Sequence, residues 1–77
     1  MEIEVRLFNE LKLYKRGEKN IFPFELEPGS RVNDLLAKLQ IQPNAKHIIL
    51  VNGRRADKKT LLHSSDIVVL LSPVAGG

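Results

Sequence analysis

The chain ends in Ser72-Pro73-Val74-Ala75-Gly76-Gly77, directly after an apolar stretch, and its terminal carboxylate is the group best placed for chemistry. Gly76 and Gly77 have no Cβ, so this end can pass through a narrow channel and adopt backbone angles closed to other residues. Pro73 fixes φ at the root of the segment, which lowers the entropy lost on docking, and Val74 offers an apolar anchor. The pattern favours a carboxylate presented to another protein; a frayed end of small residues is the alternative.

Other reactive groups are scarce. The chain has no Cys, which excludes a disulfide framework, a Cys-based metal site and a Cys nucleophile. His47 and His63 are isolated in the sequence, so we expect surface or loop positions for both and no metal site. No metal or other bound cofactor is expected.

Charge and hydropathy exclude further classes of protein. The net charge of +3 is mild, and eight of the twelve Lys and Arg residues fall in segments 12–19 and 54–59 without the dense stripe of a nucleic-acid binder. No apolar run approaches the ~20 residues that span a bilayer, and the acidic, alternating N-terminus fits no secretory signal. We therefore expect a cytoplasmic protein with no nucleic-acid or membrane partner; the sequence assigns no role to the basic segment 12–19.

The first half of the chain predicts two strands and a helix. Residues 1–8 alternate charged and aliphatic side chains, the period of a half-buried strand. Residues 21–26 form a second strand, and Pro23 within it indicates a sheet edge. Ser30 is expected to be the N-cap of an amphipathic helix over 31–40, which Pro43-Asn44 would end.

The second half predicts a hairpin and a last strand. The apolar run 48–51 leads into Asn52-Gly53, the strongest short hairpin signal, with a return strand over 54–56. Leu61 and Leu62 are expected to anchor the next loop on the core, and 67–71 is the last strand. One helix on one face of a mixed four- to five-stranded sheet gives an α+β domain over 1–71, with a flexible tail over 72–77. The first and last strands should pair in parallel at the centre.

The last two long strands are apolar on both faces, although a single helix covers only one face of a sheet. If Ile49 and Leu70 face the helix, Leu50, Val69 and Leu71 point outward beside the tail. Such a patch is typical of a docking surface, and Arg54 or Arg55 next to the hairpin turn is a further docking candidate. Covering by a loop, or ordinary exposed aliphatic surface, is the alternative.

Several motifs resemble one protein family over the whole chain. Arg6-Leu7-Phe8, the Pro-Gly-Ser helix entry, Val51-Asn52-Gly53-Arg54, Ser65-Asp66 and the ending Pro73-Val74-Ala75-Gly76-Gly77 are similar to those of the MoaD/ThiS family of ubiquitin-like sulfur carriers. The ending looks closest to that of the small subunit of molybdopterin synthase. Leu71 and Ser72 depart from that branch, which often has an aromatic residue and a second proline there. The resemblance implies the β-grasp (ubiquitin-like) fold.

The resemblance also implies a role as a carrier, not an enzyme. A ubiquitin-activating-like adenylyltransferase would use ATP to adenylate the Gly77 carboxylate, and a sulfur donor would convert it to a thiocarboxylate. Pro73, Val74, Ala75 and Gly76 would be the recognised tail. The sulfur would pass to an acceptor enzyme such as the molybdopterin synthase large subunit. A thiamin-thiazole or other sulfur pathway, a protein modifier conjugated through Gly77, and a plain interaction module remain alternatives.

Overall fold

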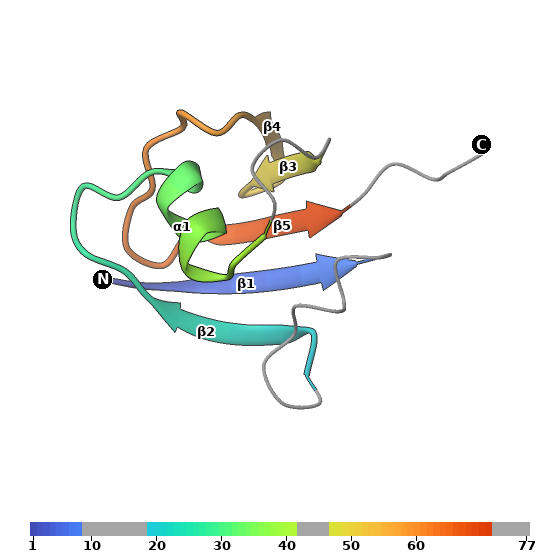
Figure 1. Cartoon of the computed structure of the whole chain (residues 1–77), viewed down its shortest axis with the longest axis horizontal. Helices are drawn as coiled ribbons and strands as arrows, with labels where there is room; N and C mark the ends of the chain where they lie inside the picture. Colours follow the sequence, from blue (N-terminus) through green and yellow to red (C-terminus); the bar gives the residue numbers. More distant parts are fainter. Residues whose placement is uncertain (9–18, 42–46, 72–77) are drawn as a thin grey trace.

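The computed structural model describes residues 1–8, 19–41 and 47–71 of the 77-residue chain. Figure 1 shows a single helix lying across one face of a twisted sheet. The elements, in chain order, are β1 (Glu2–Phe8), β2 (Ile21–Glu25), α1 (Val32–Lys38), β3 (Ile48–Val51), β4 (Arg54–Ala56) and β5 (Ile67–Leu71). This order of strands and helix confirms the prediction, including the short return strand.

The sheet has five strands in the order β2-β1-β5-β3-β4. β1 and β5 pair in parallel, with Val5 opposite Val68, and the other three pairings are antiparallel. The parallel pairing of the first and last strands is therefore confirmed. β2 lies at one edge, as Pro23 predicted, and the three-residue β4 lies at the other.

The core lies between the helix and the sheet. Alternate residues of β1 are buried at 2% exposure or less, because the period of two points them all at the helix. The helix contributes Val32, Leu35 and Leu36, which recur at a spacing of three and four. The other buried apolar side chains are Phe22, Leu26, Leu39, Ile41, Ile49, Leu62, Val68 and Leu70. Of the two predicted loop anchors, Leu62 is buried, but Leu61 is 41% exposed and that prediction is wrong.

The start of the helix differs from the prediction. The N-cap is Arg31 and not Ser30, whose hydroxyl donates to the Glu27 carbonyl over 2.7 Å. The free N–H groups of the first turn are satisfied from elsewhere in the chain: Val32 donates to the Thr60 carbonyl and Asn33 to the Lys58 carbonyl. Because a distant loop supplies these acceptors, a side-chain cap at Ser30 is not needed.

The helix also ends earlier than predicted. Gln40 adopts a positive φ of 62°, its N–H donates to the Ala37 carbonyl, and the Ile41 N–H reaches back to the Leu36 carbonyl over 2.9 Å. These two bonds are those of a Schellman motif, whose apolar contact pairs the two buried residues Leu36 and Ile41. The helix therefore stops at Lys38, before Pro43-Asn44, which lies outside the described residues.

Candidate functional site

The reactive terminus lies outside the described residues, as do Pro73, Val74, Ala75 and Gly76 before it. The structure shows where this segment leaves the folded domain. β5 ends at Leu71, between Phe8 of β1 on one side and Ile48 of β3 on the other. Figure 1 shows the tip of β5 at the opposite end of the sheet from the N-terminus. The segment that carries Gly77 therefore follows in sequence from the middle strand of the sheet.

The three predicted apolar docking residues share the face of the sheet that the helix leaves open. Val69 pairs with Leu50, and both are half-buried. Leu71 is also half-buried, and because it lies two residues after Val69 on β5 it is on the same face of the sheet. Their neighbours Ile49, Val68 and Leu70 are buried on the helix side. The alternation predicted from the sequence is therefore correct, and Leu50, Val69 and Leu71 form a continuous surface beside the root of the tail.

Two further apolar residues belong to this surface and were not predicted. Phe8 and Ile48 are half-buried and pair with Leu71 from its two sides. We call the five residues Phe8, Ile48, Leu50, Val69 and Leu71 the tail-end patch. The signal was present in the sequence, because Ile48 has the parity of Leu50 and Phe8 continues the outward side of the first strand.

The hairpin register changes which arginine adjoins the tail-end patch. Arg54 pairs with Val51, whose side chain packs against the core, whereas Arg55 pairs with Leu50. Because directly opposed residues of paired strands share a face, Arg55 lies beside the patch and Arg54 lies on the helix side. Both are exposed. Of the two predicted arginines, Arg55 therefore adjoins the apolar surface and Arg54 does not.

Neither histidine belongs to the tail-end patch, although His47 immediately precedes Ile48. His63 is exposed, and the Nδ1 atom of half-buried His47 is enclosed with no hydrogen-bond partner among residues 1–8, 19–41 and 47–71. Burial, with the nearby Lys58 ammonium, lowers the pKa of His47 below its usual value of 6.5. Within the described part of the chain no His, Cys, Asp or Glu cluster could hold a metal ion. The described residues also contain no helix long and apolar enough to cross a membrane.

Solved structures of similar fold include a chain of a molybdopterin-converting factor complex and small archaeal modifier proteins. Over 100% of both chains, ours is 29% identical to a chain in the complex of subunits 1 and 2 of the molybdopterin-converting factor from Helicobacter pylori, at a TM-score of 0.65. Small archaeal modifier protein 1 from Methanosarcina acetivorans is 26% identical, with 99% of this chain and 96% of that chain covered and a TM-score of 0.72. SAMP1 from Haloferax volcanii is 19% identical over 100% of both chains, at a TM-score of 0.77.

These likenesses confirm the expected fold, a β-grasp domain with a five-stranded mixed sheet and one helix. A comparison with curated proteins gives no match. The model of the ThiS family matches residues 5–77, which include all of β5 and both terminal glycines. Because the match spans almost the entire chain, the protein belongs to the ThiS family, among the ubiquitin-like sulfur carriers of the MoaD/ThiS type.

Proposed function

We propose that this protein carries sulfur as a thiocarboxylate on Gly77 and donates it to a partner enzyme, with molybdopterin biosynthesis as the leading pathway. The observation that carries the proposal is the family match, which runs through Gly76 and Gly77 and not only through the folded domain. The 29% identity to a chain of the molybdopterin-converting factor complex favours this pathway over the others. A thiamin-thiazole pathway, or another sulfur acceptor, is the alternative within the same chemistry.

The chemistry requires activation because a carboxylate is a poor electrophile at neutral pH. An activating enzyme would join the Gly77 carboxylate to the AMP part of ATP, releasing pyrophosphate. A sulfur donor at the oxidation level of sulfide would then displace AMP, leaving one sulfur in place of one carboxylate oxygen. The thiocarboxylate sulfur would then attack an electrophilic carbon of the acceptor, displace a leaving group from that carbon and form an acyl thioester. Water attacking the thioester carbonyl would return the Gly77 carboxylate and leave the sulfur on the acceptor as a thiolate. The proposal places this cycle in the cytoplasm, because activation consumes ATP.

The tail-end patch supports the carrier role. A carrier whose tail enters the active site of a partner enzyme needs a surface that binds that enzyme and keeps the tail in place. Its five apolar side chains lie on three adjacent strands around the point where the tail leaves. Arg55 stands at one border of the patch and Arg6 at another, as neighbours of Leu50 and Val69. An apolar centre with charged residues at its rim is the usual composition of a protein–protein interface. We propose this patch as the docking surface for both the activating and the acceptor enzyme.

A second candidate function is conjugation of Gly77 to lysines of other proteins. The 26% identity to small archaeal modifier protein 1 from Methanosarcina acetivorans favours it. Activation is the same in both functions, and only the nucleophile that attacks the activated carbonyl differs. Sulfur transfer produces a thiocarboxylate on the free protein, whereas conjugation produces an isopeptide bond and a ladder of heavier species.

The test is the intact mass of the protein purified from its own host without thiols. A mass increase equal to the exchange of one oxygen for one sulfur, mapped to Gly77, is the expected result. The same protein should gain that mass when incubated with an activating enzyme, ATP and sulfide, and a Gly77 deletion should not. If the full chain and the deletion behave identically in both experiments, the carrier function is wrong and an interaction module replaces it. An isopeptide ladder with no thiocarboxylate would favour the modifier function.

A further inference from the structure

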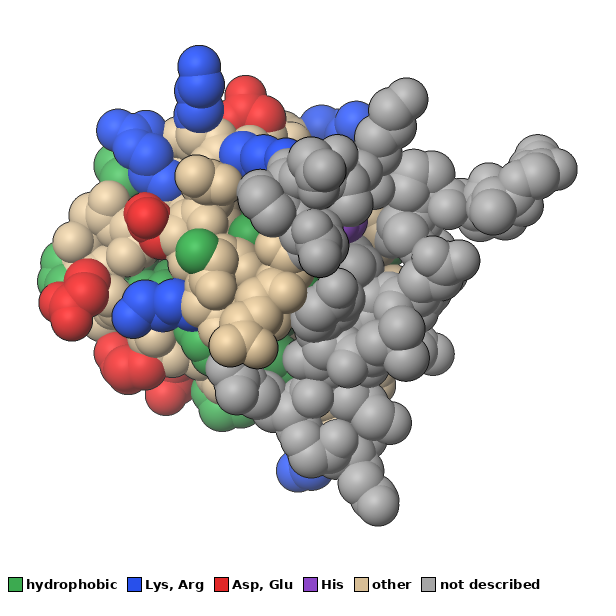
Figure 2. All heavy atoms as spheres, in the orientation of Figure 1, with side chains coloured by type: hydrophobic (Ala, Val, Ile, Leu, Met, Phe, Trp, Pro, Cys, Tyr) green, Lys and Arg blue, Asp and Glu red, His purple; other side chains and the backbone are tan. Residues whose placement is uncertain are grey.

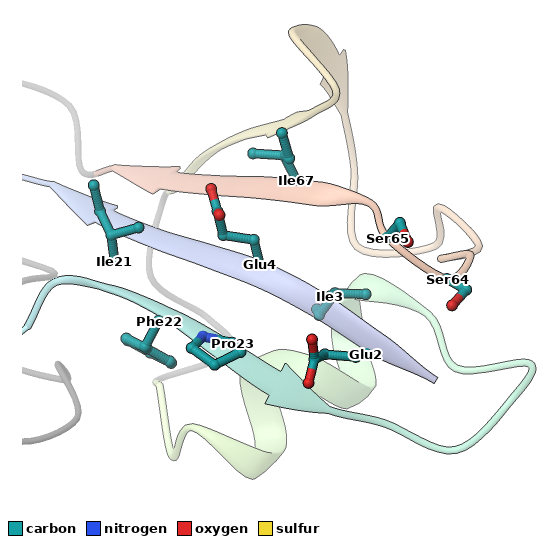
Figure 3. A pocket seen from close by; sticks show the side chains of 9 residues that line it. All are labelled: Glu2, Ile3, Glu4, Ile21, Phe22, Pro23, Ser64, Ser65 and Ile67. Atoms are coloured by element: carbon teal, nitrogen blue, oxygen red, sulfur yellow. The ribbon is translucent and has the colours of Figure 1, made fainter.

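A recess of about 390 Å³ lies on the open face of the sheet, at the end remote from the tail. It is bounded by β1, β2 and the turn that precedes β5. Figure 3 shows the Glu4 side chain standing between Ile21 and Ile67, with Glu2 beside Pro23. We call this recess the acidic groove. It is separated from Leu71 by the length of β5, about 13 Å at roughly 3.3 Å per residue.

Apolar side chains flank the glutamates on both sides. Glu4 pairs with Pro23 of β2 and with Ile67 of β5. Two residues further along β1, Arg6 pairs with Ile21 of β2, so Ile21 lies on the same face as Pro23. Ile21 is 44% exposed and Ile67 is 36% exposed. Within the described residues only one other large hydrophobic side chain, that of Leu61, is exposed to a similar degree. Two of these three exposed side chains therefore lie in one recess, where covering them would release water from apolar surface.

The charge of the groove is opposite to that of the chain. The nine residues that line it include two glutamates and no Lys, Arg or His, although the chain carries a net charge of +3. Glu4 is bonded to Arg6 at the border, but the Glu2 carboxylate has no ion pair within the described residues. On the helix side of the molecule, Figure 2 shows acidic side chains at the end where β1 begins, with a basic side chain among them, and several basic side chains over the loop after β4. Because the Glu2 carboxylate is left without an ion-pair partner in the described part of the chain and stands beside apolar walls, the recess favours a cationic, aliphatic occupant.

We propose that the acidic groove docks an extended segment of a partner protein that presents basic, aliphatic and basic side chains at alternate positions. Alternate positions of an extended segment are about 6.8 Å apart, which is also the spacing of Glu2 and Glu4, so a basic side chain at Glu2 places the neighbouring aliphatic side chain at Glu4, between Ile21 and Ile67. A basic residue on each side of the aliphatic one allows this pairing in either chain direction. The segment would lie on the face of the sheet and not extend its edge, because Pro23 leaves the outer edge of β2 without its central N–H donor. The tail-end patch stays free, so the groove adds a second contact that does not depend on the proposed sulfur chemistry.

The test is an NMR titration of the full ¹⁵N-labelled chain with the peptide acetyl-Gly-Lys-Ser-Ile-Ser-Lys-Gly-amide. We expect saturable shifts at the amides of Glu4, Ser65 and Ile67, with a Kd of about 1 mM or tighter. Raising the salt to about 1 M should abolish them, because the Debye length then falls to about 3 Å. Replacing the peptide's isoleucine by serine should weaken binding by about fivefold, since the apolar contact is lost.

Two matched variants of the protein separate this docking from general charge attraction. Glu2→Gln should weaken binding of the lysine peptide by about threefold, the effect of losing one exposed ion pair. Glu27→Gln removes an exposed carboxylate at the same end of the molecule but outside the groove, and should leave Kd unchanged. Equal effects of both variants, equal binding of a peptide with glutamates for its lysines, shifts centred on Leu50 and Leu71, or no saturable shifts would each overturn the proposal. None of these outcomes bears on thiocarboxylate formation at Gly77.

Discussion

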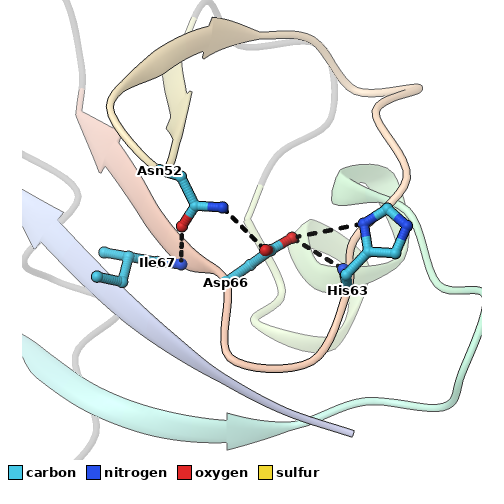
Figure 4. A network of polar contacts seen from close by, with 4 residues as sticks. All are labelled: Asn52, His63, Asp66 and Ile67. Carbon is cyan, nitrogen blue, oxygen red and sulfur yellow. Dashed lines mark hydrogen bonds and ion pairs between the residues drawn. The ribbon is translucent and has the colours of Figure 1, made fainter.

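The side-chain amide of Asn52 donates a hydrogen bond to Asp66 Oδ1 over 2.9 Å, and so joins the β3–β4 turn to the start of β5 (Figure 4). The Asn52 side-chain oxygen accepts from the Ile67 N–H at 2.9 Å, and the Asn52 N–H donates to the Ile67 carbonyl at 2.8 Å. Asp66 is 8% exposed, and its other oxygen accepts from the His63 N–H. These hydrogen bonds fix the position of Ile67, the first residue of β5. They thereby also fix the strand register that places Leu71 between Phe8 and Ile48.

Substitution of Asn52 should therefore cost more than its exposed position suggests. Its φ is 52°, which Asn tolerates and Ala does not, and its side chain satisfies a buried carboxylate oxygen. Asn52→Ala is expected to lower the free energy of unfolding by about 3 kcal/mol, the sum of a lost buried hydrogen bond and about 1 kcal/mol of backbone strain. Urea denaturation monitored by circular dichroism measures the change.

The matched variant for this prediction is Asn52→Gly, which loses the same side-chain bonds but accepts a positive φ without strain. It should be about 1 kcal/mol more stable than Asn52→Ala. If the two variants unfold at the same urea concentration, backbone strain contributes nothing at this position. If both lose less than about 1 kcal/mol, the link between Asn52 and Asp66 does not hold β5 in place.

Strand identities could be predicted from local patterns, whereas helix ends could not. The alternation along β1 and the Asn52-Gly53 turn are short-range signals, and each gave the observed element. The helix boundaries depend on partners distant in sequence: the Thr60 carbonyl accepts the Val32 N–H, so a cap at Ser30 is unnecessary. At the other end Gln40 takes a positive φ that no local preference indicates.

The same division holds for the candidate site. Leu50, Val69 and Leu71 could be predicted because strand parity alone assigns them to one face. Counting across the two-residue turn would also have placed Arg55 rather than Arg54 there. The acidic groove could not be found this way, because it depends on which residues of three strands and a turn stand side by side. That register appears only once the sheet is assembled.

Alanine substitution of two adjacent residues of β5 should have different main effects, one on the stability of the fold and the other on binding of a partner enzyme. Leu70 is fully buried, so Leu70→Ala is expected to lower the free energy of unfolding by about 3 kcal/mol through lost burial and the cavity left behind. Leu71 is half-buried on the open face, and Leu71→Ala should cost about 1 kcal/mol. If the tail-end patch docks the activating enzyme, Leu71→Ala should instead raise the KM of that enzyme for the protein by about tenfold.

Thermal unfolding and activation kinetics of the two variants check this prediction together. Activation should be measured well below the melting temperature of Leu70→Ala, so that both variants are folded. A KM raised equally by both substitutions would indicate a general loss of structure. A KM unchanged by Leu71→Ala would exclude Leu71 from the docking surface while leaving the chemistry of Gly77 untouched.

Pro23 is expected to keep the outer edge of the sheet from pairing with other chains. Leu26 donates to the Met1 carbonyl and Leu7 donates to the Asn20 carbonyl, which defines the hydrogen-bonded pairs of this antiparallel ladder. By alternation the backbone groups of Pro23 point outward, and proline offers no N–H there. Pro23→Val restores the donor and a strand-favouring side chain, so it should produce concentration-dependent dimers or larger species in sedimentation velocity.

The control for this prediction is Pro28→Val, which makes the same exchange in the exposed turn after β2. It should sediment as the parent protein does at every concentration. Association of both variants would indicate that loss of a proline loosens the fold in general. A monomeric Pro23→Val would show that the edge is protected by something other than the missing donor.

His47 should make stability depend on pH in a range where carboxylates do not titrate. Burial, with the charge of Lys58, favours the neutral ring and lowers the pKa of His47 in the folded protein below 6.5. Among the described residues, the charged side chains that line the same recess of about 420 Å³ as His47 are those of Asp57, Lys58 and Lys59. As the pH falls through 6.5, the unfolded chain takes up a proton that the folded chain does not, so the stabilisation present above 6.5 is lost below it.

Urea unfolding between about pH 7.5 and about pH 5.5, above the range of Asp and Glu, measures this loss. The free energy of unfolding should fall with decreasing pH, with a slope that one proton limits to about 1.4 kcal/mol per pH unit. His47→Gln should reduce the slope, because the titrating group is gone, whereas the exposed His63→Gln should retain it. A slope in His47→Gln equal to that of the parent protein would contradict the prediction.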